Sequence, residues 1–390
     1  MPTSIVLSEA GHKVLGVDVK NHIVETINKG ISHISEKGLQ KKLKKSIANG
    51  SFIARKSPDY SDVFLITVPT PFKKDSSKIP KPDLNYVYEA IKSCIPFLKK
   101  GNLIIIESTC PVGTTNDVLN FIKKEKVDSK NIYLAYCPER VLPGNITNEL
   151  INNDRVVGGI NKLSSLKAFE FYKTFCKGSI EISDSKTAEM VKLTENSYRD
   201  LNLAFANEIS IICEKQAIDV NQLISIANKH PRVNILNPGC GVGGHCIAVD
   251  PWFLISQNIN ESNLLITSRK VNYLKTNWVV NKIQEKGELL QKEIGRLPNI
   301  GLMGMTFKAN VGDIRNSPAL EIVKALLKTS FKIMPYDPFI NDSEIFDIYS
   351  IEDINKYADL IVYLVPHEDF KNFKFEGKKI IDFCGLTNNI

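Results

Sequence analysis

Short apolar runs alternate with amphipathic segments along the first part of the chain. The apolar runs are of strand length and lie at 13–17, 63–68, 103–107 and 132–136. Helical patterns lie between them, at 21–29, 85–98 and 114–124. This alternation predicts a parallel sheet covered by helices. Prolines and glycines follow the strand-like runs, at the end of the sheet where open α/β folds bind their ligands.

The middle of the chain has a different pattern, and the first pattern then returns. Helical periodicity without strands runs from about Thr187 to Asn228 and, after a proline- and glycine-rich loop, on to about Lys292. Alternating strands and helices resume from Asn299. We therefore predict an α/β protein with two Rossmann-like, doubly wound domains joined by a central helical domain. The predicted boundaries are 1–180, 181–295 and 296–390.

The first predicted domain begins unusually. A dinucleotide-binding fold opens with a strand and a Gly-x-Gly-x-x-Gly turn that lets the backbone approach the pyrophosphate. Asp18 stands where the acidic ribose-binding residue is expected, and the seventeen residues before it contain no such turn. Residues 4–9 are typical of the helix that follows the turn. We expect the first strand and the glycine-rich loop to be missing, either through a start codon assigned too late or through loss of the NAD site.

Composition limits the classes of function. The chain has 390 residues, 43% of them hydrophobic and 24% charged, which is typical of a globular protein of two or three domains. The apolar runs are all shorter than the roughly 18 residues that span a bilayer. The first residues do not have the pattern of a signal peptide, so we expect a cytoplasmic protein. The net charge of +7 is modest, and the lysines at 41–45 lack neighbouring aromatic residues. We therefore expect no membrane and no nucleic-acid partner.

One of the eight cysteines stands out. Most of them are expected to be buried free thiols, since no Cys-x-x-Cys spacing occurs. Cys246 ends the run Gly239-Cys240-Gly241-Val242-Gly243-Gly244-His245-Cys246. Such glycine density indicates a backbone that closely approaches something, and the cysteine behind it would be presented as a nucleophilic thiolate. Two other interpretations stay open at this point, a zinc site with Cys240 and His245 and a buried structural thiol.

A polar stripe lies on the helix predicted at 188–215. Lys192, Asn196 and Arg199 follow the spacing that places side chains on one helix face. Apolar residues, including Leu193 and Leu201, occupy the opposite positions. On this evidence alone the stripe is best interpreted as a solvent-exposed face.

Several segments, taken together and in order, resemble a known family. They lie at 68–72, 107–113, 135–144, 192–200, 230–235, 243–251 and 307–318. The chain resembles the UDP-glucose/GDP-mannose dehydrogenase family over almost its whole length, and most closely the members that oxidise UDP-N-acetyl-D-mannosamine. The resemblance implies NAD-dependent, four-electron oxidation of the C6 hydroxymethyl group to a carboxylate, through a thiohemiacetal and a thioester on Cys246. The alternatives are another nucleotide sugar, UDP-glucose or UDP-N-acetylglucosamine, or an inactive remnant that binds a sugar nucleotide.

The resemblance also implies roles for individual residues. Cys246 would be the nucleophile. Lys192 would stabilise or deprotonate the alkoxide, and Asn196 would hold the same oxygen or a water. Glu139 would act as the base in thioester hydrolysis, and Asp250 would orient the Lys192 ammonium.

The remaining implied residues bind ligands. The cofactor contacts are Asp18, Thr70, Thr109 and Arg315. The substrate contacts are Arg140, Val141, Arg199, His230, Arg232, Gly243, Phe307 and Lys308. Asp18 favours NAD over NADP because a carboxylate repels a 2′-phosphate. Relatives place a basic residue where this chain has Cys384, so a substrate contact is expected to be weakened there. The resemblance further implies a UDP-sugar substrate, no metal, and a homodimer formed through the central helical domain, with Arg232 contributed across its interface.

Overall fold

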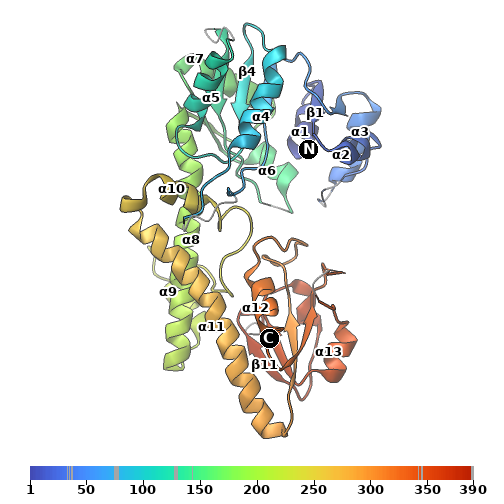
Figure 1. Cartoon of the computed structure of the whole chain (residues 1–390), viewed down its shortest axis with the longest axis vertical. Coiled ribbons are helices and arrows are strands. Elements are labelled where there is room, and N and C mark those ends of the chain that lie inside the picture. The colour runs from blue at the N-terminus through green and yellow to red at the C-terminus, as the bar shows by residue number, and fades with distance from the viewer. Residues whose placement is uncertain are drawn as a thin grey trace. The chain divides into compact units, whose positions relative to one another are not determined.

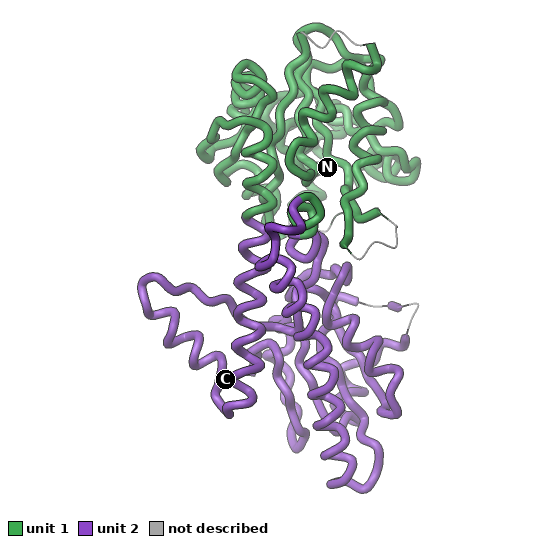
Figure 2. Tube along the Cα trace, turned by 60° about the vertical axis from the view of Figure 1, so that its left-hand side comes forward, with its two compact units in different colours: residues 1–194, 252–257 green, residues 195–251, 258–390 purple. Residues whose placement is uncertain are grey.

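The computed structural model describes residues 1–32, 34, 36, 38–73, 79–126, 131–142, 144–340, 342–343 and 346–387. The chain divides into two compact units (Figure 2). Unit 1 holds residues 1–194 and 252–257, and unit 2 holds residues 195–251 and 258–390. Within the described ranges, no helix combines the length and the apolar character needed to cross a membrane.

Unit 1 contains a five-stranded sheet that is covered on both faces (Figure 1). Its strands, in spatial order, are β3 (Val63–Ile66), β4 (Leu103–Ile106), β5 (Tyr133–Tyr136), β6 (Arg155–Gly159) and β7 (Ile180–Asp184). Neighbouring strands are parallel except β5 and β6. One face packs on α4 (Asn85–Cys94) and α5 (Thr114–Lys124), and the other packs on α1 (Pro2–Glu9), α6 (Ile146–Asn152) and α7 (Lys162–Lys173). Burial on both faces explains why β4 is apolar at every position.

Two further strands of unit 1 form a separate parallel sheet. They are β1 (Val14–Val17) and β2 (Phe52–Arg55), and they pack with α2 (Asn21–Asn28) and α3 (Leu39–Ala48). Helix α1 packs on both sheets, since Ile5 contacts the smaller one while Val6 and Leu7 contact the larger one. Among the described residues, β1 pairs only with β2 and β3 only with β4. The strand order is therefore interrupted between β1 and β3, at the place of the first strand in a dinucleotide fold.

Long helices follow in the middle of the chain. They are α8 (Ser185–Gln216), α9 (Val220–Ala227), α10 (Asp250–Gln257) and α11 (Asn263–Ile294). In unit 2 the buried Asp200 of α8 accepts hydrogen bonds from Arg269 at 2.6 Å, Asn272 at 2.8 Å and Ser268 at 3.0 Å, all on α11. Opposite charges with additional hydrogen-bond donors can be buried together, so this network fixes how α8 lies on α11.

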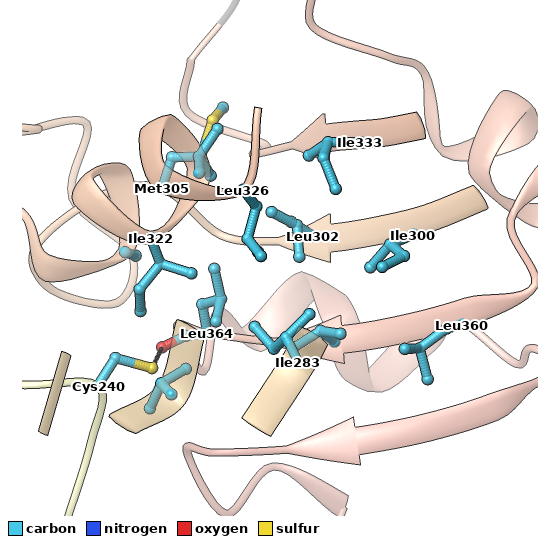
Figure 3. Close-up of a cluster of buried hydrophobic side chains, with 14 of the residues drawn as sticks. Cys240, Ile283, Ile300, Leu302, Met305, Ile322, Leu326, Ile333, Leu360 and Leu364 are labelled. Atoms are coloured by element: carbon cyan, nitrogen blue, oxygen red, sulfur yellow. Dashed lines mark hydrogen bonds between the residues drawn. The ribbon is translucent and has the colours of Figure 1, made fainter. Parts of the chain in front are cut away.

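The C-terminal part of unit 2 is a four-stranded parallel sheet. Its spatial order is β11 (Lys379–Asp382), β10 (Leu360–Tyr363), β8 (Asn299–Met303) and β9 (Lys332–Tyr336). One face packs on α11 and α12 (Pro318–Leu326), and the other packs on α13 (Ile351–Tyr357). Figure 3 shows the first of these cores, in which Ile283 of α11 and Ile322 and Leu326 of α12 face the apolar side chains of the sheet.

The predicted fold class is confirmed, with a correction at one helix end. The helix predicted at 85–98 ends at Cys94 and continues as a 3-10 turn, because Pro96 has no backbone N–H to donate. The helix predicted at 188–215 corresponds to α8, which ends at Gln216, just before Ala217 with its φ of 53°. Asp219 then begins α9 by accepting hydrogen bonds from two first-turn amides.

Candidate active site

Residues 239–246 of unit 2 form a loop that ends at Cys246, called the cysteine loop below. Its glycines allow it to approach its neighbours closely. A Cβ atom on Gly243 would lie 2.5 Å from the carbonyl oxygen of Asn316. Gly244 has a φ of +84°, and a Cβ atom there would lie 2.9 Å from the ring of Phe307. The prediction that these glycines mark a close approach is therefore confirmed: the loop packs directly on the segment that precedes α12.

The first part of this loop is anchored to the two long helices. The Gly239 amide donates to Asn207 Oδ1 at 2.9 Å, and Thr276 Oγ1 donates to the Cys240 carbonyl at 2.8 Å. The buried Cys240 thiol donates to the Leu364 carbonyl at 3.4 Å (Figure 3). Burial raises the pKa of Cys240 to about 12. Cys240 is therefore a buried, hydrogen-bonded thiol. The described part of the chain has no group of three or more His, Cys, Asp and Glu residues that could hold a metal.

Cys246 lies at the end of the loop, half-buried, just before α10. Its carbonyl accepts hydrogen bonds from the amides of Val249 at 2.9 Å and Asp250 at 2.8 Å. The buried Asp250 carboxylate accepts a hydrogen bond from Asn196 Nδ2 at 2.5 Å. The structure thus brings three of the predicted catalytic residues together in unit 2. A fourth residue was predicted only as a zinc ligand: His245 Nδ1 lies 2.8 Å from Cys246 Sγ.

Two other predicted catalytic residues meet in unit 1. Lys192 Nζ donates to the backbone carbonyl of Glu139 at 2.7 Å. The side chains of Lys192 and Asn196 are buried, at 8% exposure each, whereas Arg199 is exposed. The interpretation of this stripe as a solvent-exposed face is therefore wrong for the first two residues. The ammonium of Lys192 is held at a fixed place beside the segment that follows β5.

Three buried residues, Arg155, Tyr172 and Glu107, form a connected cluster next to Glu139. Arg155 Nη2 lies 3.8 Å from Glu139 Oε2, and the guanidinium stands 4.9 Å from the ring centre of Tyr172. The Tyr172 hydroxyl donates to the fully buried Glu107 at 2.6 Å. Burial raises the pKa of Glu107 to about 7, and the charge of Glu139 adds to the rise while Arg155 opposes it. Sequence reasoning did not assign Glu107, Arg155 or Tyr172 to this site, although a charged residue beside an apolar strand was a possible signal.

The predicted cofactor residues of unit 1 follow the carboxyl ends of strands. Thr70 and Thr109 follow the paired strands β3 and β4, whose ends are joined by a 2.7 Å hydrogen bond from Ser108 Oγ to the Val68 carbonyl. Asp18 follows β1, and its Oδ1 accepts the Lys20 amide at 2.8 Å. A carboxylate at the end of β1 fits a ribose diol.

The amino end of α5, at the same edge of the sheet, is occupied by a carboxylate of the chain itself. Glu189 accepts hydrogen bonds from the Gly113 amide at 2.6 Å, the Thr115 amide at 2.8 Å and the Thr115 hydroxyl at 2.6 Å. Burial raises the pKa of Glu189, and these hydrogen bonds oppose the rise. The Glu189 carboxylate of α8 therefore occupies the position at the amino end of α5 where an anion would otherwise bind.

The predicted substrate residues fall into three groups. In unit 1 a guanidinium nitrogen of Arg140 donates to the Asp154 carbonyl, and Val141 packs on the sheet. In unit 2 the segment 307–316 lies against the cysteine loop, and it carries Phe307, Lys308 and the predicted cofactor contact Arg315. Arg199 on α8, and His230 and Arg232 in the segment after α9, are exposed.

Two Rossmann-like domains, with a helical segment and a glycine-framed cysteine between them in the sequence, define a nucleotide-dependent dehydrogenase. The chain belongs to the UDP-glucose/GDP-mannose dehydrogenase family. Residues 1–176 match its NAD-binding domain, 186–273 its central domain and 301–389 its UDP-binding domain. The cofactor is therefore NAD, and the chain is an oxidoreductase.

Curated relatives cover nearly the full chain. A UDP-N-acetyl-D-mannosamine dehydrogenase of Campylobacter jejuni is 42% identical over 98% of this chain and 96% of that protein. The enzyme of the same name from Methanococcus aeolicus is 44% identical over 98% of this chain and 85% of its own.

Solved structures agree. The UDP-D-ManNAc dehydrogenase of Pyrococcus horikoshii matches with a TM-score of 0.90 at 33% identity, covering 99% of this chain and 93% of that one. The UDP-N-acetyl-mannosamine dehydrogenase of Staphylococcus aureus matches with a TM-score of 0.87 at 38% identity, covering 99% and 92%.

The raised pKa of Glu107 predicts how stability changes with pH. Its pKa is near 7 in the folded chain and 4.5 in the ordinary, solvated state, so between these values the folded protein binds more protons than the unfolded one. Stability is then lost as pH rises through this window. Glu107→Gln removes the effect, and its stability advantage should grow by on the order of 2–3 kcal/mol between pH 4.5 and 7. Urea unfolding at several pH values measures it. Glu89→Gln, on the exposed face of α4, is the matched control. Parallel pH curves for wild type and Glu107→Gln would contradict the prediction.

Proposed function

We propose that the chain oxidises the C6 hydroxymethyl group of UDP-N-acetyl-D-mannosamine to the carboxylate, with two molecules of NAD+ reduced per turnover. The observation that carries the proposal is the half-buried Cys246 in a loop whose glycines allow close packing, beside the Asn196–Asp250 pair. The identity of 42–44% to relatives named for this substrate supports the choice of sugar. A relative named NDP-N-acetyl-D-galactosaminuronic acid dehydrogenase is 38% identical, so a different nucleotide sugar is the second candidate.

The cofactor supplies the hydride acceptor, which no side chain can provide. Asp18 would hold the adenosine ribose, and its charge disfavours the additional phosphate of NADP. Thr70 and Thr109 would contact the cofactor from the ends of β3 and β4, and Arg315 is the remaining proposed contact.

Fixed donors at the reacting oxygen would lower the barrier to both oxidation steps. Lys192 is buried and held by a hydrogen bond, so its ammonium needs little reorganisation to stabilise an alkoxide. Asp250 fixes the amide of Asn196, whose second N–H would bind the same oxygen or a water. Preorganised donors of this kind contribute roughly 3–4 kcal/mol each. Asp250 would also orient Lys192.

Cys246 would turn the second oxidation into a thioester-forming step. Its sulfur adds to the aldehyde left by the first oxidation, and the resulting thiohemiacetal loses the second hydride and becomes a thioester. Water then releases the carboxylate, with Glu139 as base. The Arg155 guanidinium lies 3.8 Å from the Glu139 carboxylate, close enough to help hold it in place.

Each of the three predicted domains is proposed to have one role, in the order of the three family domains. We assign cofactor binding to 1–180, the catalytic lysine and cysteine loop to 181–295, and UDP-sugar binding to 296–390. The sugar nucleotide would contact Arg140, Val141, Arg199, His230, Arg232, Gly243, Phe307 and Lys308. The cysteines that the structure describes are all free thiols, which favours a reducing compartment and hence the cytoplasm.

A homodimer through the central helices is also proposed. Tyr198, Phe205 and Ile212 are spaced seven residues apart on α8 and are 65%, 51% and 49% exposed. This spacing aligns them along one side of the helix. An exposed apolar stripe of this length is typical of a protein–protein interface, and Tyr273 and Leu274 of α11 are exposed as well. Arg232 would reach the partner's substrate.

Substrate choice is tested by NADH formation with a panel of nucleotide sugars. UDP-N-acetyl-D-mannosamine should give the largest kcat/KM and two NADH per sugar consumed. Substituting NADP+ should lower the rate because of Asp18. Faster turnover of UDP-glucose or UDP-N-acetylglucosamine would replace the proposed substrate.

The nucleophile is tested by Cys246→Ser. A serine ester neither forms nor hydrolyses as readily, so net acid formation should fall at least a thousandfold while UDP-sugar binding changes less than threefold. Mass spectrometry of the product and calorimetric titration measure the two effects. Cys176→Ser, at another half-buried free thiol, is the matched control. Normal acid production by Cys246→Ser would exclude the thioester route.

The dimer is tested by Phe205→Glu combined with Tyr198→Glu. The two substitutions place two negative charges without partners in an apolar interface, so the chain should become a monomer. Size-exclusion chromatography with light scattering measures this change. Leu163→Glu on the exposed face of α7 should leave the mass unchanged. A monomeric wild-type chain would contradict the proposed dimer.

A further inference from the structure

The residue directly before the proposed nucleophile is placed to exchange a proton with it. His245 Nδ1 lies 2.8 Å from Cys246 Sγ, a separation at which one proton is shared between nitrogen and sulfur. His245 is exposed and Cys246 is half-buried, so the imidazole can also exchange protons with water.

The backbone on both sides of this pair is held in place. The Gly244 amide donates to the Arg315 carbonyl at 3.1 Å, and Asn316 Nδ2 donates to the Gly244 carbonyl at 3.2 Å. On the other side, two amides bind the Cys246 carbonyl. The imidazole and the thiol are therefore presented on a rigid turn, which is what a preorganised proton-transfer pair needs.

Charged groups of the neighbouring segment suit an imidazolium and a thiolate. Arg315 binds Asp313 through Nε at 2.9 Å and Nη2 at 2.5 Å. Burial opposes ionisation of Asp313, but the hydrogen bonds from Arg315 and the charge of His245 hold the pKa of this carboxyl below its usual value. Hydrogen bonding to Asp313 raises the pKa of Arg315, and the negative charge of Cys246 adds to the rise. Asp313 and Arg315 therefore lie within electrostatic range of His245 and Cys246, respectively.

Two more charged residues, Asp250 and Lys308, belong to the segments beside this pair. The Asp250 carboxylate is buried and accepts its hydrogen bond from Asn196. Its backbone amide donates to the Cys246 carbonyl at 2.8 Å. On the side of the segment 307–316, Phe307 contributes only an apolar ring against Gly244. Lys308 adds a half-buried cation to that segment.

We propose that His245 is a catalytic residue, the acid–base partner that takes the thiol proton of Cys246 and returns it during turnover. This inference rests on the proposed function. The thiol S–H bond breaks and an N–H bond forms on the imidazole. The S–C6 bond then forms while the carbonyl π pair moves to oxygen, which takes the proton from the imidazolium. When the thiohemiacetal loses its hydride to NAD+, the imidazole accepts the hydroxyl proton. On hydrolysis a water oxygen bonds to C6 while Glu139 takes a proton from the water, and the C–S bond breaks. The sulfur leaves as a thiolate and recovers its proton from the imidazolium, and the new carboxylic acid releases its proton to solvent.

The decisive measurement does not require the chain to turn over substrate. Iodoacetamide alkylates the thiolate, and peptide mass spectrometry reports the rate at Cys246 from pH 5.5 to 10 in the full chain. His245→Gln keeps a polar side chain of similar reach but cannot take a proton. The half-maximal alkylation rate should move to higher pH in this variant. Its rate at pH 7 should fall roughly five- to tenfold and approach the wild-type rate at pH 10. His22→Asn, on the exposed face of α2, is the matched control.

Each outcome decides the proposal. Identical pH profiles for wild type and His245→Gln would overturn it. A loss of rate that is the same at every pH would also overturn it, since that indicates altered access to the sulfur rather than a lost proton acceptor. A wild-type chain that forms no NADH with any UDP-sugar would remove the proposed function, while the alkylation profile would still show whether the dyad exists. Where NADH is formed, acid production by His245→Gln should recover as pH rises toward 10.

Discussion

The buried ion pair between Asp200 and Arg269 is the interaction on which the cysteine loop depends. Two charges removed from water are costly, and the pair is tolerated because Asp200 has further hydrogen-bond donors on α11. The network continues outward: Asn272 binds both Asp200 and Asn207, and Asn207 receives the amide of Gly239. A continuous path of hydrogen bonds thus joins the contact between α8 and α11 to the first residue of the loop. A change in how these helices pack would move the loop that carries Cys246.

The same loop depends on the C-terminal sheet for its other wall. Asp337, at the end of β9, accepts the amides of Met305 at 2.6 Å and Thr306 at 3.1 Å. The buried His367 lies 3.2 Å from Asp337 and accepts the Asn310 amide at 3.0 Å. These contacts fix the start of the segment that packs on the glycines. The site is therefore built jointly by the central helices and by the sheet that matches the UDP-binding domain.

Much of the fold could be predicted from the sequence, because strand-sized apolar runs and helical periodicity are local signals. The site could be predicted less evenly. The glycine run correctly indicated a close approach, since few other features explain such density. The burial of Lys192 could not be predicted from periodicity, because a polar stripe looks the same whether it faces water or a packed neighbour. Arg155 begins β6 and Glu107 follows β4 as single charged residues beside apolar runs, and only the folded chain shows that Arg155 lies beside Glu139. The catalytic assignments came from the family resemblance rather than from spacing.

The contact of Glu189 with the amino end of α5 affects how unit 1 can bind anions. Glu189 accepts hydrogen bonds from amides at the amino end of α5 that would otherwise attract an anion. These amides therefore already have an acceptor when a nucleotide binds. Lys192 lies one helical turn further along α8. The start of α8 is therefore attached to the cofactor domain by a carboxylate that binds a helix end in the way a phosphate group would. A free phosphate group could compete with that contact only by displacing part of the chain's own active-site scaffold.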